Sequence, residues 1–524
     1  MLDEDFFSDE GSIVGDEDEI FIDGLEDFVD HESLECLKSM SEKVNFEIEE
    51  ERNEFLREVD PLIINWQGKL PNLRDIFRVD ELESLLLQSV NYLREVQDDQ
   101  TIYQVRRFIK FVIHTGYRDE PKFDEEGKPL LNRKTALHII GRFSKCQIIN
   151  RITDDLFQIY NRFDVNYTDD TGFTHFHAAC YNGRRRVVQQ FLECHQDPNC
   201  IWTETGATPL HAALFRASRK TAKLLLTYGA DPNFADRRTG GTSLHMLTWD
   251  GYADDYGAEM FFEYSNDQYK PVQVNALDKW NMTPLEWAVA NALPNTAKVF
   301  LDNGADLSDF VFPSAHNFGG VYESYADEID YNSRPDIKLG MGAGALAVAE
   351  LLEERGYELE RSDAQAIMSF FIKRELFQKP EDLDIDCIYN DNEFVTVAKD
   401  AMILPNLSLY DLIALRPDEA EKRLTYMDYC TFARSNDFRS LPEKFKEVCA
   451  MHLCEKLSRG LFERWTLYFY SELIRYRLTV VPCRLIIENW TNKDLCNICL
   501  AVINDRDSDS DSDSDLSVKR RRIC

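Results

Sequence analysis

Apolar residues recur at helical spacing along most of the chain. Leu82, Leu85, Leu86, Val90 and Leu93 stand three or four positions apart, as on one face of a helix. A second face of this kind is formed by Ile102, Val105, Phe108, Ile109 and Val112. Gly116 follows it and is typical of a helix end. We interpret residues 51–116 as a helical cap, or a degenerate first repeat, that covers the apolar end of the next region.

A short motif then recurs through the middle of the chain. Its copies are Thr135-Ala-Leu-His138, Thr174-His-Phe-His177, Thr208-Pro-Leu-His211, Thr242-Ser-Leu-His245 and Thr283-Pro-Leu-Glu286. The last residues of successive copies are separated by 39, 34, 34 and 41 positions. A period near 33 with insertions at either end predicts a stacked array of helical repeats, which we place at residues 117–314. Such an array offers a long surface, which favours recognition over catalysis.

The unit from Thr208 to Asn233 shows the local chemistry most clearly. Thr208 is expected to cap a first helix, and Pro209 at the next position lacks only an amide that would have no partner. A second helix is predicted from Thr221 to Tyr228, and Gly229 ends it in the left-handed conformation. The Pro and Asn of the next four residues, 230–233, predict a turn.

The unit resembles an ankyrin repeat almost residue for residue, through Thr208-Pro-Leu-His-Ala-Ala213 and Leu224-Leu-Leu-Thr-Tyr-Gly-Ala-Asp-Pro-Asn233. Further matching fragments are Thr171-Gly-Phe-Thr-His-Phe-His-Ala-Ala179 and Asn303-Gly-Ala-Asp306. The resemblance implies structural roles for Thr135, His138, Thr174, His177, Thr208, Pro209, His211, Gly229, Thr242, His245, Thr283, Pro284 and Gly304. Departures are Ala136 in place of Pro, and Glu286-Trp287 in place of His-Ala.

One unit carries an insertion between Asp250 and Val272. It is rich in aromatic residues, namely Tyr252, Tyr256, Phe261, Phe262 and Tyr264. The insertion either enlarges the binding face or lengthens a helix hairpin, and the sequence does not choose between these two.

Histidines and cysteines raise the question of a metal. The motif histidine recurs once per unit, whereas a single metal site would not need a histidine in every repeat. In ankyrin-like units this histidine forms hydrogen bonds across the loops between repeats, so we interpret it as structural. Cys496 and Cys499 have the spacing of zinc ligands, and Cys449, His452 and Cys454 lie upstream. Both groups fall within apolar helical patterns, so we interpret the cysteines as core thiols and expect no metal or other cofactor.

A polar linker is predicted at residues 315–337, followed by a helical domain at 338–504. Its expected helices are Ala345–Leu352, Ala364–Phe377, Phe394–Ile403, Leu407–Leu415, Ala420–Tyr429, Phe445–Leu457 and Leu461–Leu478. Gly340-Met-Gly342-Ala-Gly344 precedes the first of these. It lacks both the G-x-G-x-x-G spacing and the preceding strand of a nucleotide-binding loop.

Near the end of this domain, the sequence predicts a segment with exposed apolar side chains. Pro482 is expected near a helix start, with Leu485, Ile486 and Trp490 along one face. Thr491 or Asn492 is expected to end this helix and cap the next one. Leu495 and Ile498 then begin another apolar face. Two short helices meeting at an angle can lie in a partner's groove. The alternative is that they close the core of the domain.

This segment resembles a shortened F-box, whose pattern is a Pro start, an apolar helix, a polar break and Asp-Leu (here Asp494-Leu495) opening the next helix. With an ankyrin array before it, the region looks like the PRANC domain of poxvirus and parasitoid-wasp ankyrin proteins. The stretch from Leu407 through Leu441-Pro442 to Ala501 is similar in layout. Cys483 and Arg484 depart from the family pattern, where a second Pro or an acid is common. The resemblance implies binding to the Skp subunit of a cullin-based ubiquitin ligase through Pro482, Leu485, Ile486, Trp490, Leu495 and Ile498.

Charge narrows the class of partner. The net charge is −35, with 59 basic and 94 acidic residues, and a negative body repels phosphate, so nucleic-acid binding is not expected as the main function. No secretory signal and no membrane span are apparent. The 13 cysteines form no regular framework, which favours reduced thiols in a cytoplasmic or nuclear protein.

Both ends of the chain are strongly charged. Residues 1–50 hold 19 acidic residues against two lysines, and residues 505–524 alternate Asp and Ser before a basic cluster. We predict that both segments are disordered. The first is either a solvating tail or a linear motif for a partner's basic groove. The serines at 508–514 suit acidic-directed kinases, and the basic cluster is a candidate nuclear import signal formed by Lys519, Arg520, Arg521 and Arg522.

The sequence thus predicts an all-α protein: an ankyrin repeat solenoid, a C-terminal helical domain and disordered acidic termini. No catalytic constellation emerges, so we expect no enzyme. The favoured function is an adaptor that holds a client protein on its repeats and recruits an SCF-type (Skp-cullin-F-box) ubiquitin ligase. Two alternatives remain: an ankyrin scaffold or inhibitor that sequesters a regulatory protein, and a nuclear regulator whose acidic N-terminus activates transcription.

Overall fold

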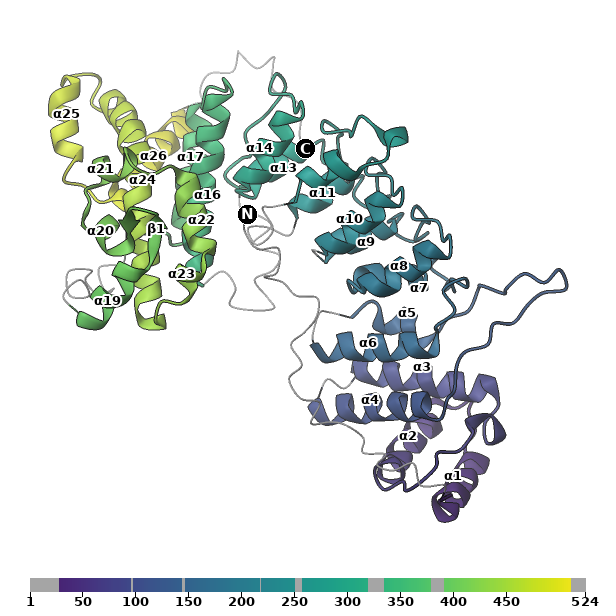
Figure 1. The fold of residues 1–524 in the computed structure, drawn as a ribbon. Coiled ribbons are helices and arrows are strands. Elements are labelled where there is room, and N and C mark those ends of the chain that lie inside the picture. Colours follow the sequence, from purple (N-terminus) through teal and green to yellow (C-terminus); the bar gives the residue numbers. More distant parts are fainter. Residues whose placement is uncertain are drawn as a thin grey trace. The chain divides into compact units, whose positions relative to one another are not determined.

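The computed structural model describes residues 28–95, 98–143, 147–216, 218–249, 257–318, 334–377 and 391–509. It divides into two compact units (Figure 1). Unit 1 comprises Met1–Met246 and Met260–Val272, and unit 2 comprises Leu247–Glu259 and Gln273–Cys524. The division falls inside the predicted repeat array rather than at the predicted linker.

The first helix of unit 1 lies in the segment predicted to be disordered. Helix α1 (His31–Lys43) begins at Asp30, whose side chain accepts a 3.0 Å hydrogen bond from the Ser33 N–H. It buries Leu37 and packs on α2 (Glu49–Ile64). The prediction of disorder is therefore wrong for residues 31–50, because one buried leucine and a capped first turn anchor an otherwise polar helix. Residues 1–27 lie outside the described part.

Helices pack together in the segment predicted as a cap. After η1 (Leu73–Asp75), α3 (Val79–Glu95) and α4 (Asp99–His114) bury the two predicted apolar faces, including Leu85 and Ile109. Helix α4 ends just before Gly116, which has a positive φ of 81°, as the glycine stop predicted.

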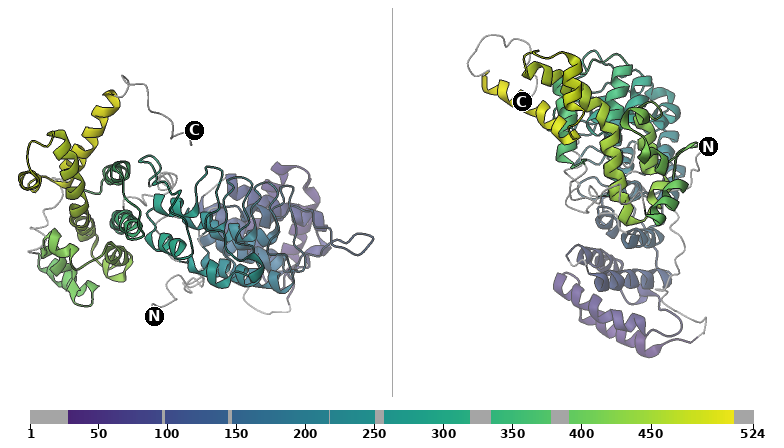
Figure 2. Two further views of the ribbon diagram at one scale, coloured as in Figure 1. Left: turned by 90° about the horizontal axis from the view of Figure 1, so that it is seen from above. Right: turned by 90° about the vertical axis from the view of Figure 1, so that its left-hand side faces the viewer.

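Helix pairs form the repeats of unit 1 (Figure 1). They are α5 (Ala136–Ile140) with α6 (Gln147–Ile159), α7 (His175–Tyr181) with α8 (Arg185–Glu193), and α9 (Pro209–Phe215) with α10 (Arg219–Thr227). The right-hand view of Figure 2 shows the purple and blue helices of this unit as successive layers. The first helix of each pair is buried almost throughout. Gly229 ends α10 with a φ of 90°, as predicted.

The insertion is fastened to the preceding repeats where it is described. The chain passes through α11 (Ser243–Thr248), which spans the division between the units, and α12 (Glu259–Tyr264) to η3 (Asp267–Tyr269). The Tyr269 carbonyl accepts a 2.8 Å hydrogen bond from Asn233, and its hydroxyl lies 3.2 Å from the Asn199 amide. These contacts do not choose between the two alternatives for the insertion, and residues 250–256 lie outside the described part.

The last repeat belongs to unit 2. It consists of α13 (Pro284–Ala290) and α14 (Pro294–Asp302), and α14 packs on α16 (Pro335–Glu354). The Gly340–Gly344 run lies inside α16 and not before the first helix of the domain, which corrects the predicted helix start at Ala345.

The other helices of unit 2 surround α16 and a long central helix. They are α17 (Arg361–Lys373), α19 (Asn392–Asp400), α20 (Leu409–Ala414), α21 (Pro417–Glu421), α22 (Tyr426–Arg434), α23 (Asn436–Arg439), α24 (Glu443–Leu473), α25 (Val480–Ile487) and α26 (Asn492–Asp509). Helices α16, α22 and α24 lie side by side (Figure 1).

Three expectations for this region need correction. The two helices predicted between Phe445 and Leu478 are the single helix α24, since Gly460 is accommodated within it. A short antiparallel hairpin, β1 (Met402–Leu404) with β2 (Leu407–Ser408), stands where only helices were expected. Helix α26 also continues to Asp509, into the tail predicted to be disordered. The predicted all-α fold class, an ankyrin solenoid followed by a helical domain, is nonetheless confirmed. Within the described residues, no helix has both the length and the apolar character that crossing a bilayer requires.

Candidate partner-binding surfaces

The repeat motif locks each first helix to its own start. Nδ1 of His138 accepts a 3.0 Å hydrogen bond from the Thr135 N–H, and the same contact joins Thr208 to His211 at 3.1 Å and Thr242 to His245 at 3.0 Å. In the fifth copy a carboxylate replaces the imidazole, and Glu286 accepts from the Thr283 N–H at 2.7 Å. In the second copy the Thr174 hydroxyl lies 2.9 Å from Nδ1 of His177.

The first copy also shows how the motif joins neighbouring repeats. Nε2 of His138 lies 3.1 Å from the carbonyl oxygen of Tyr167, in the loop before the next motif. Because Nδ1 accepts from an N–H, Nε2 carries the proton and donates to that carbonyl. The contact crosses between repeats, as the ankyrin resemblance implied.

These histidines are neutral parts of the framework. Burial lowers the pKa of His138, His177 and His211 to about 4 in each case. A neutral ring is what the motif needs, because a protonated Nδ1 cannot accept the threonine N–H. Among the residues that the structure describes, no group of three potential ligands is arranged to hold a metal ion.

Aromatic rings and arginines line the ends of the first helices in unit 1. Arg142 lies over the ring of Phe173 at 4.5 Å and pairs with Asp169 at 2.7 Å. One repeat further, Tyr181 stacks against Phe215 with ring centroids 5.6 Å apart. In sequence, Arg142, Tyr181 and Phe215 each stand seven residues after the motif threonine. The sequence analysis named none of them as a site, although this shared register could have revealed them.

The predicted Skp-binding residues divide between surface and core. On α25, Leu485 is 59% exposed and Ile486 36% exposed, whereas Leu495 on α26 is completely buried. Pro482 near the start of α25, Trp490 in the turn and Ile498 on α26 are partly exposed. The structure therefore corrects the expectation of a second exposed apolar face opened by Leu495, because that side chain packs within unit 2.

Further exposed apolar residues adjoin α25 that the sequence analysis did not name. They extend from the last residue of α24 to the first residues of α25: Leu473, Tyr476, Leu478, Val480 and Val481. We call these five residues together with Leu485 and Ile486 the apolar edge. The sequence could have indicated this surface, because the mostly apolar run Leu478-Thr-Val-Val481 stands directly before Pro482.

An arginine of α24 holds the turn between α25 and α26. The guanidinium of Arg459 donates to the carbonyls of Ile487 and Glu488, each at 3.1 Å, and to Oδ1 of Asn492 at 3.2 Å. These carbonyls close α25, so Arg459 caps that helix and fixes its direction. The Thr491 N–H donates to Asp494 at 3.1 Å and caps α26, in agreement with the predicted break at this position.

The cysteines with zinc-like spacing are core residues, as interpreted from the sequence. Cys449 and Cys454 on α24 and Cys496 and Cys499 on α26 are all buried. Burial raises the pKa of Cys499 to about 11 and that of Cys449 to about 12, so both thiols are protonated at neutral pH.

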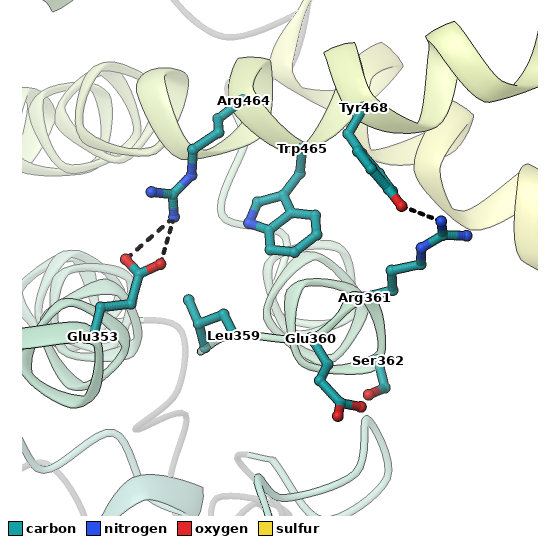
Figure 3. Close-up of a pocket in the computed structure, with 8 residues that line it drawn as sticks. All are labelled: Glu353, Leu359, Glu360, Arg361, Ser362, Arg464, Trp465 and Tyr468. Atoms are coloured by element: carbon teal, nitrogen blue, oxygen red, sulfur yellow. Dashed lines mark hydrogen bonds and ion pairs between the residues drawn. The ribbon is translucent and has the colours of Figure 1, made fainter. Parts of the chain in front are cut away.

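A wide depression of about 850 Å³ lies between α16, α17 and α24 (Figure 3). The Trp465 indole stands at its centre, between Arg464, which pairs with Glu353 at 3.3 Å, and the contact of Arg361 with the Tyr468 hydroxyl. Arg361 also pairs with Glu472 at 2.9 Å. Both arginines are paired, and Trp465 and Tyr468 give the depression an aromatic wall.

Comparison with known proteins bears on the repeats. The family model described as ankyrin repeats, with three copies, matches residues 144–236. A search of curated proteins gave no match for the chain. The chain therefore carries ankyrin repeats in a mostly helical fold, and such repeats imply binding to other proteins. The candidate import signal, residues 519–522, lies outside the described residues.

Proposed function

We propose that the protein is an adaptor without catalytic activity of its own. Its ankyrin repeats hold a client protein, and its C-terminal segment recruits an SCF-type ubiquitin ligase through the Skp subunit. The contribution to ubiquitin transfer is proximity, since the client and the charged enzyme are held on one assembly at a raised effective concentration.

The apolar edge is the observation that carries the ligase part of this proposal. Val481 is 68% exposed and Leu485 59% exposed, next to one another on α25. Exposed apolar clusters of this kind are typical of surfaces that bind another protein. Arg459 and the capped start of α26 hold the underlying helices in a fixed arrangement, so binding does not have to order a flexible segment first.

The burial of Leu495 changes which residues the proposal uses. Its binding surface consists of α25 and the chain leading into it, while Leu495 keeps α26 attached to the domain. Leu495→Asp places a charge in the core and is expected to unfold this region. It is therefore unsuitable as a test of binding, whereas Leu485→Asp alters an exposed side chain.

A pull-down with a purified Skp subunit tests the proposal. The wild-type chain is expected to retain the subunit, and Leu485→Asp or Val481→Asp is expected to weaken retention at least tenfold. The matched control is Leu277→Asp, in which an equally exposed leucine (58%) outside the apolar edge is replaced. Absence of Skp retention by the wild-type chain refutes the ligase part and leaves the scaffold or inhibitor alternative.

Client stability then separates those two functions. Recruitment of a ligase shortens the half-life of a bound client, and proteasome inhibition restores it. Sequestration leaves the half-life unchanged. The same Leu485→Asp variant should retain the client and lose the effect on its half-life.

A further inference from the structure

One edge of the repeats in unit 1 combines exposed aromatic rings with a cluster of cations. It is formed by the turns that join α7 to α8 and α9 to α10. We define the basic-aromatic edge as Tyr181, Arg184, Arg185, Arg186, Phe215, Arg216, Arg219 and Lys220.

Contacts between the two turns make this a continuous surface. The rings of Tyr181 and Phe215 are nearly parallel, at 17°, and the Arg216 guanidinium lies 4.3 Å from the centre of the Tyr181 ring. Arg216 continues to the carbonyl of Phe143, which it contacts at 2.6 Å. Phe215 is nevertheless 46% exposed, so the stack presents an open aromatic face.

The charge of this edge is opposite to that of the chain as a whole. Seven of the ten charged residues between positions 181 and 223 are basic, in a chain with a net charge of −35. The three acids, Glu193, Asp197 and Glu204, follow at the end of α8 or later, away from the helix starts. Asp154 of α6 lies at this edge and pairs with Arg184 at 2.9 Å.

Helix stability does not account for these cations. Arg185 and Lys220 are exposed in the first turns of α8 and α10. The start of a helix carries partial positive charge, so cations there are unfavourable by some tenths of a kcal/mol each. Their position fits attraction to a negatively charged ligand.

We propose that the basic-aromatic edge binds the N-terminal segment of the same chain, residues 1–27. That segment contains 12 acidic residues and no lysine or arginine. Its aromatic residues, Phe6, Phe7 and Phe21, are interspersed among the acids. The edge thus pairs both features of the segment: cations for its carboxylates, and the Tyr181–Phe215 stack for its phenylalanines.

The segment is long enough to reach the edge. The described chain begins in unit 1 at Phe28, whose carbonyl accepts a hydrogen bond from the Lys69 N–H at 2.8 Å, close to the end of α2 in the sequence. Helices α2, α4 and α6 pack on one another in succession, and α8 lies in the layer that follows α6 (Figure 1). Layers about 10 Å apart give a span of roughly 30 Å. A chain spans at most about 3.5 Å per residue, so a segment of this length can reach up to about 95 Å.

Tethering makes weak binding sufficient. A segment attached through a short flexible chain has an effective concentration of about 1 mM, so an intrinsic Kd of about 0.1 mM keeps the edge about nine-tenths occupied. An acidic client would have to displace the segment. Occupation therefore regulates access to this part of the repeats, whether or not the C-terminal segment binds a ligase.

Photocrosslinking in the full-length chain tests the inference. Phe7→p-benzoylphenylalanine is irradiated at low micromolar concentration and the crosslinked peptides are mapped. Crosslinks within residues 181–186 or 215–223 of the same molecule are expected. Crosslinks elsewhere in the chain, or only between two copies, overturn the proposal.

Charge reversal and salt provide the specificity controls. Arg185→Glu with Arg186→Glu is expected to lower the crosslink yield at least tenfold. The matched pair Lys122→Glu with Lys128→Glu reverses two exposed cations of the same unit and should change the yield less than twofold. Equal losses in the two pairs overturn the proposal. In the wild-type background, raising NaCl from about 50 to 500 mM should also reduce the yield, because salt screens exposed charges, and an unchanged yield contradicts the charge complementarity.

Discussion

Gly344 in α16 lies directly against the carbonyl group of Ala292, which follows α13. A β-carbon at position 344 would stand 2.5 Å from that oxygen, closer than any side chain tolerates. The absence of a side chain is therefore what lets α16 approach the last repeat, and the contact lies wholly inside unit 2. Close helix packing therefore accounts for the glycine at position 344.

We predict that Gly344→Ala loosens this contact. The added methyl group must displace either α16 or the Ala292 backbone, which typically costs about 1–3 kcal/mol of unfolding free energy. Urea unfolding of unit 2 should show the loss.

Gly342→Ala on the same helix is the matched comparison. Its β-carbon would meet the Cys454 sulfur at 3.3 Å, a smaller conflict that is offset by the helix propensity of alanine, up to about 1 kcal/mol. If both variants unfold at the same urea concentration, close packing at Gly344 is not the reason for the glycine.

The repeats could be predicted because each unit specifies its own local structure. Thr208, Pro209 and Gly229 fix the start and end of their helices with groups that lie near in sequence, and the motif recurs. Helix α1 was missed since its stability depends on Leu37 packing against α2, a contact that composition does not reveal. The unbroken α24 was predicted as two helices, and the short stretch between Leu457 and Leu461 is helical in the structure.

The candidate site was predicted only in part. Sequence placed apolar residues at helical spacing around Pro482, but spacing alone cannot decide which face meets the core. Leu485 and Leu495 look equivalent in the sequence, yet one is exposed and the other buried. The decisive element is Arg459, whose contacts with the α25 carbonyls depend on residues about 30 positions apart.

We predict that the protein loses stability between pH 6.5 and about pH 4. Burial holds the pKa of His138, His177 and His211 near 4, whereas an imidazole in the unfolded chain has a pKa near 6.5. Below pH 6.5 the unfolded state binds protons that the folded state does not, so unfolding becomes easier. Each histidine contributes up to about 3 kcal/mol, which is lost across this window.

Thermal unfolding of His211→Gln across this pH window measures how much His211 alone contributes to the pH dependence of stability. The variant is expected to be less stable at pH 7, because the ring contact with Thr208 is lost, but to depend less steeply on pH than the wild-type chain. His316→Gln, at an exposed position, should keep the wild-type slope. Equal slopes for all three proteins would show that the buried histidines do not govern the pH dependence.

We predict that Arg459→Met releases the turn between α25 and α26. Methionine keeps much of the apolar stem but removes the donors that cap α25, so amide hydrogen exchange should become faster across residues 480–495. Binding of a Skp subunit should weaken in parallel, because the apolar edge would no longer be held in place.

Arg464→Met on the same helix is the control for Arg459. Its guanidinium pairs with Glu353 at the surface, and such pairs contribute about 0–1 kcal/mol. Its exchange pattern across residues 480–495 should match that of the wild-type chain. Unchanged exchange in Arg459→Met would remove the proposed positioning role.

We predict that Lys456→Met destabilises unit 2 strongly, although lysine is a polar residue in the core. Nζ of Lys456 donates to the carbonyls of Leu412 at 2.7 Å, Ile413 at 2.8 Å and Leu415 at 2.5 Å, which end α20. Methionine fills a similar volume but leaves these buried acceptors without their donor, at a cost of about 2–4 kcal/mol. Lys446→Met, on the same helix, removes only an ion pair with Glu443 and should cost less than about 1 kcal/mol. Urea unfolding distinguishes the two variants, and comparable losses would show that the three carbonyls do not depend on Lys456.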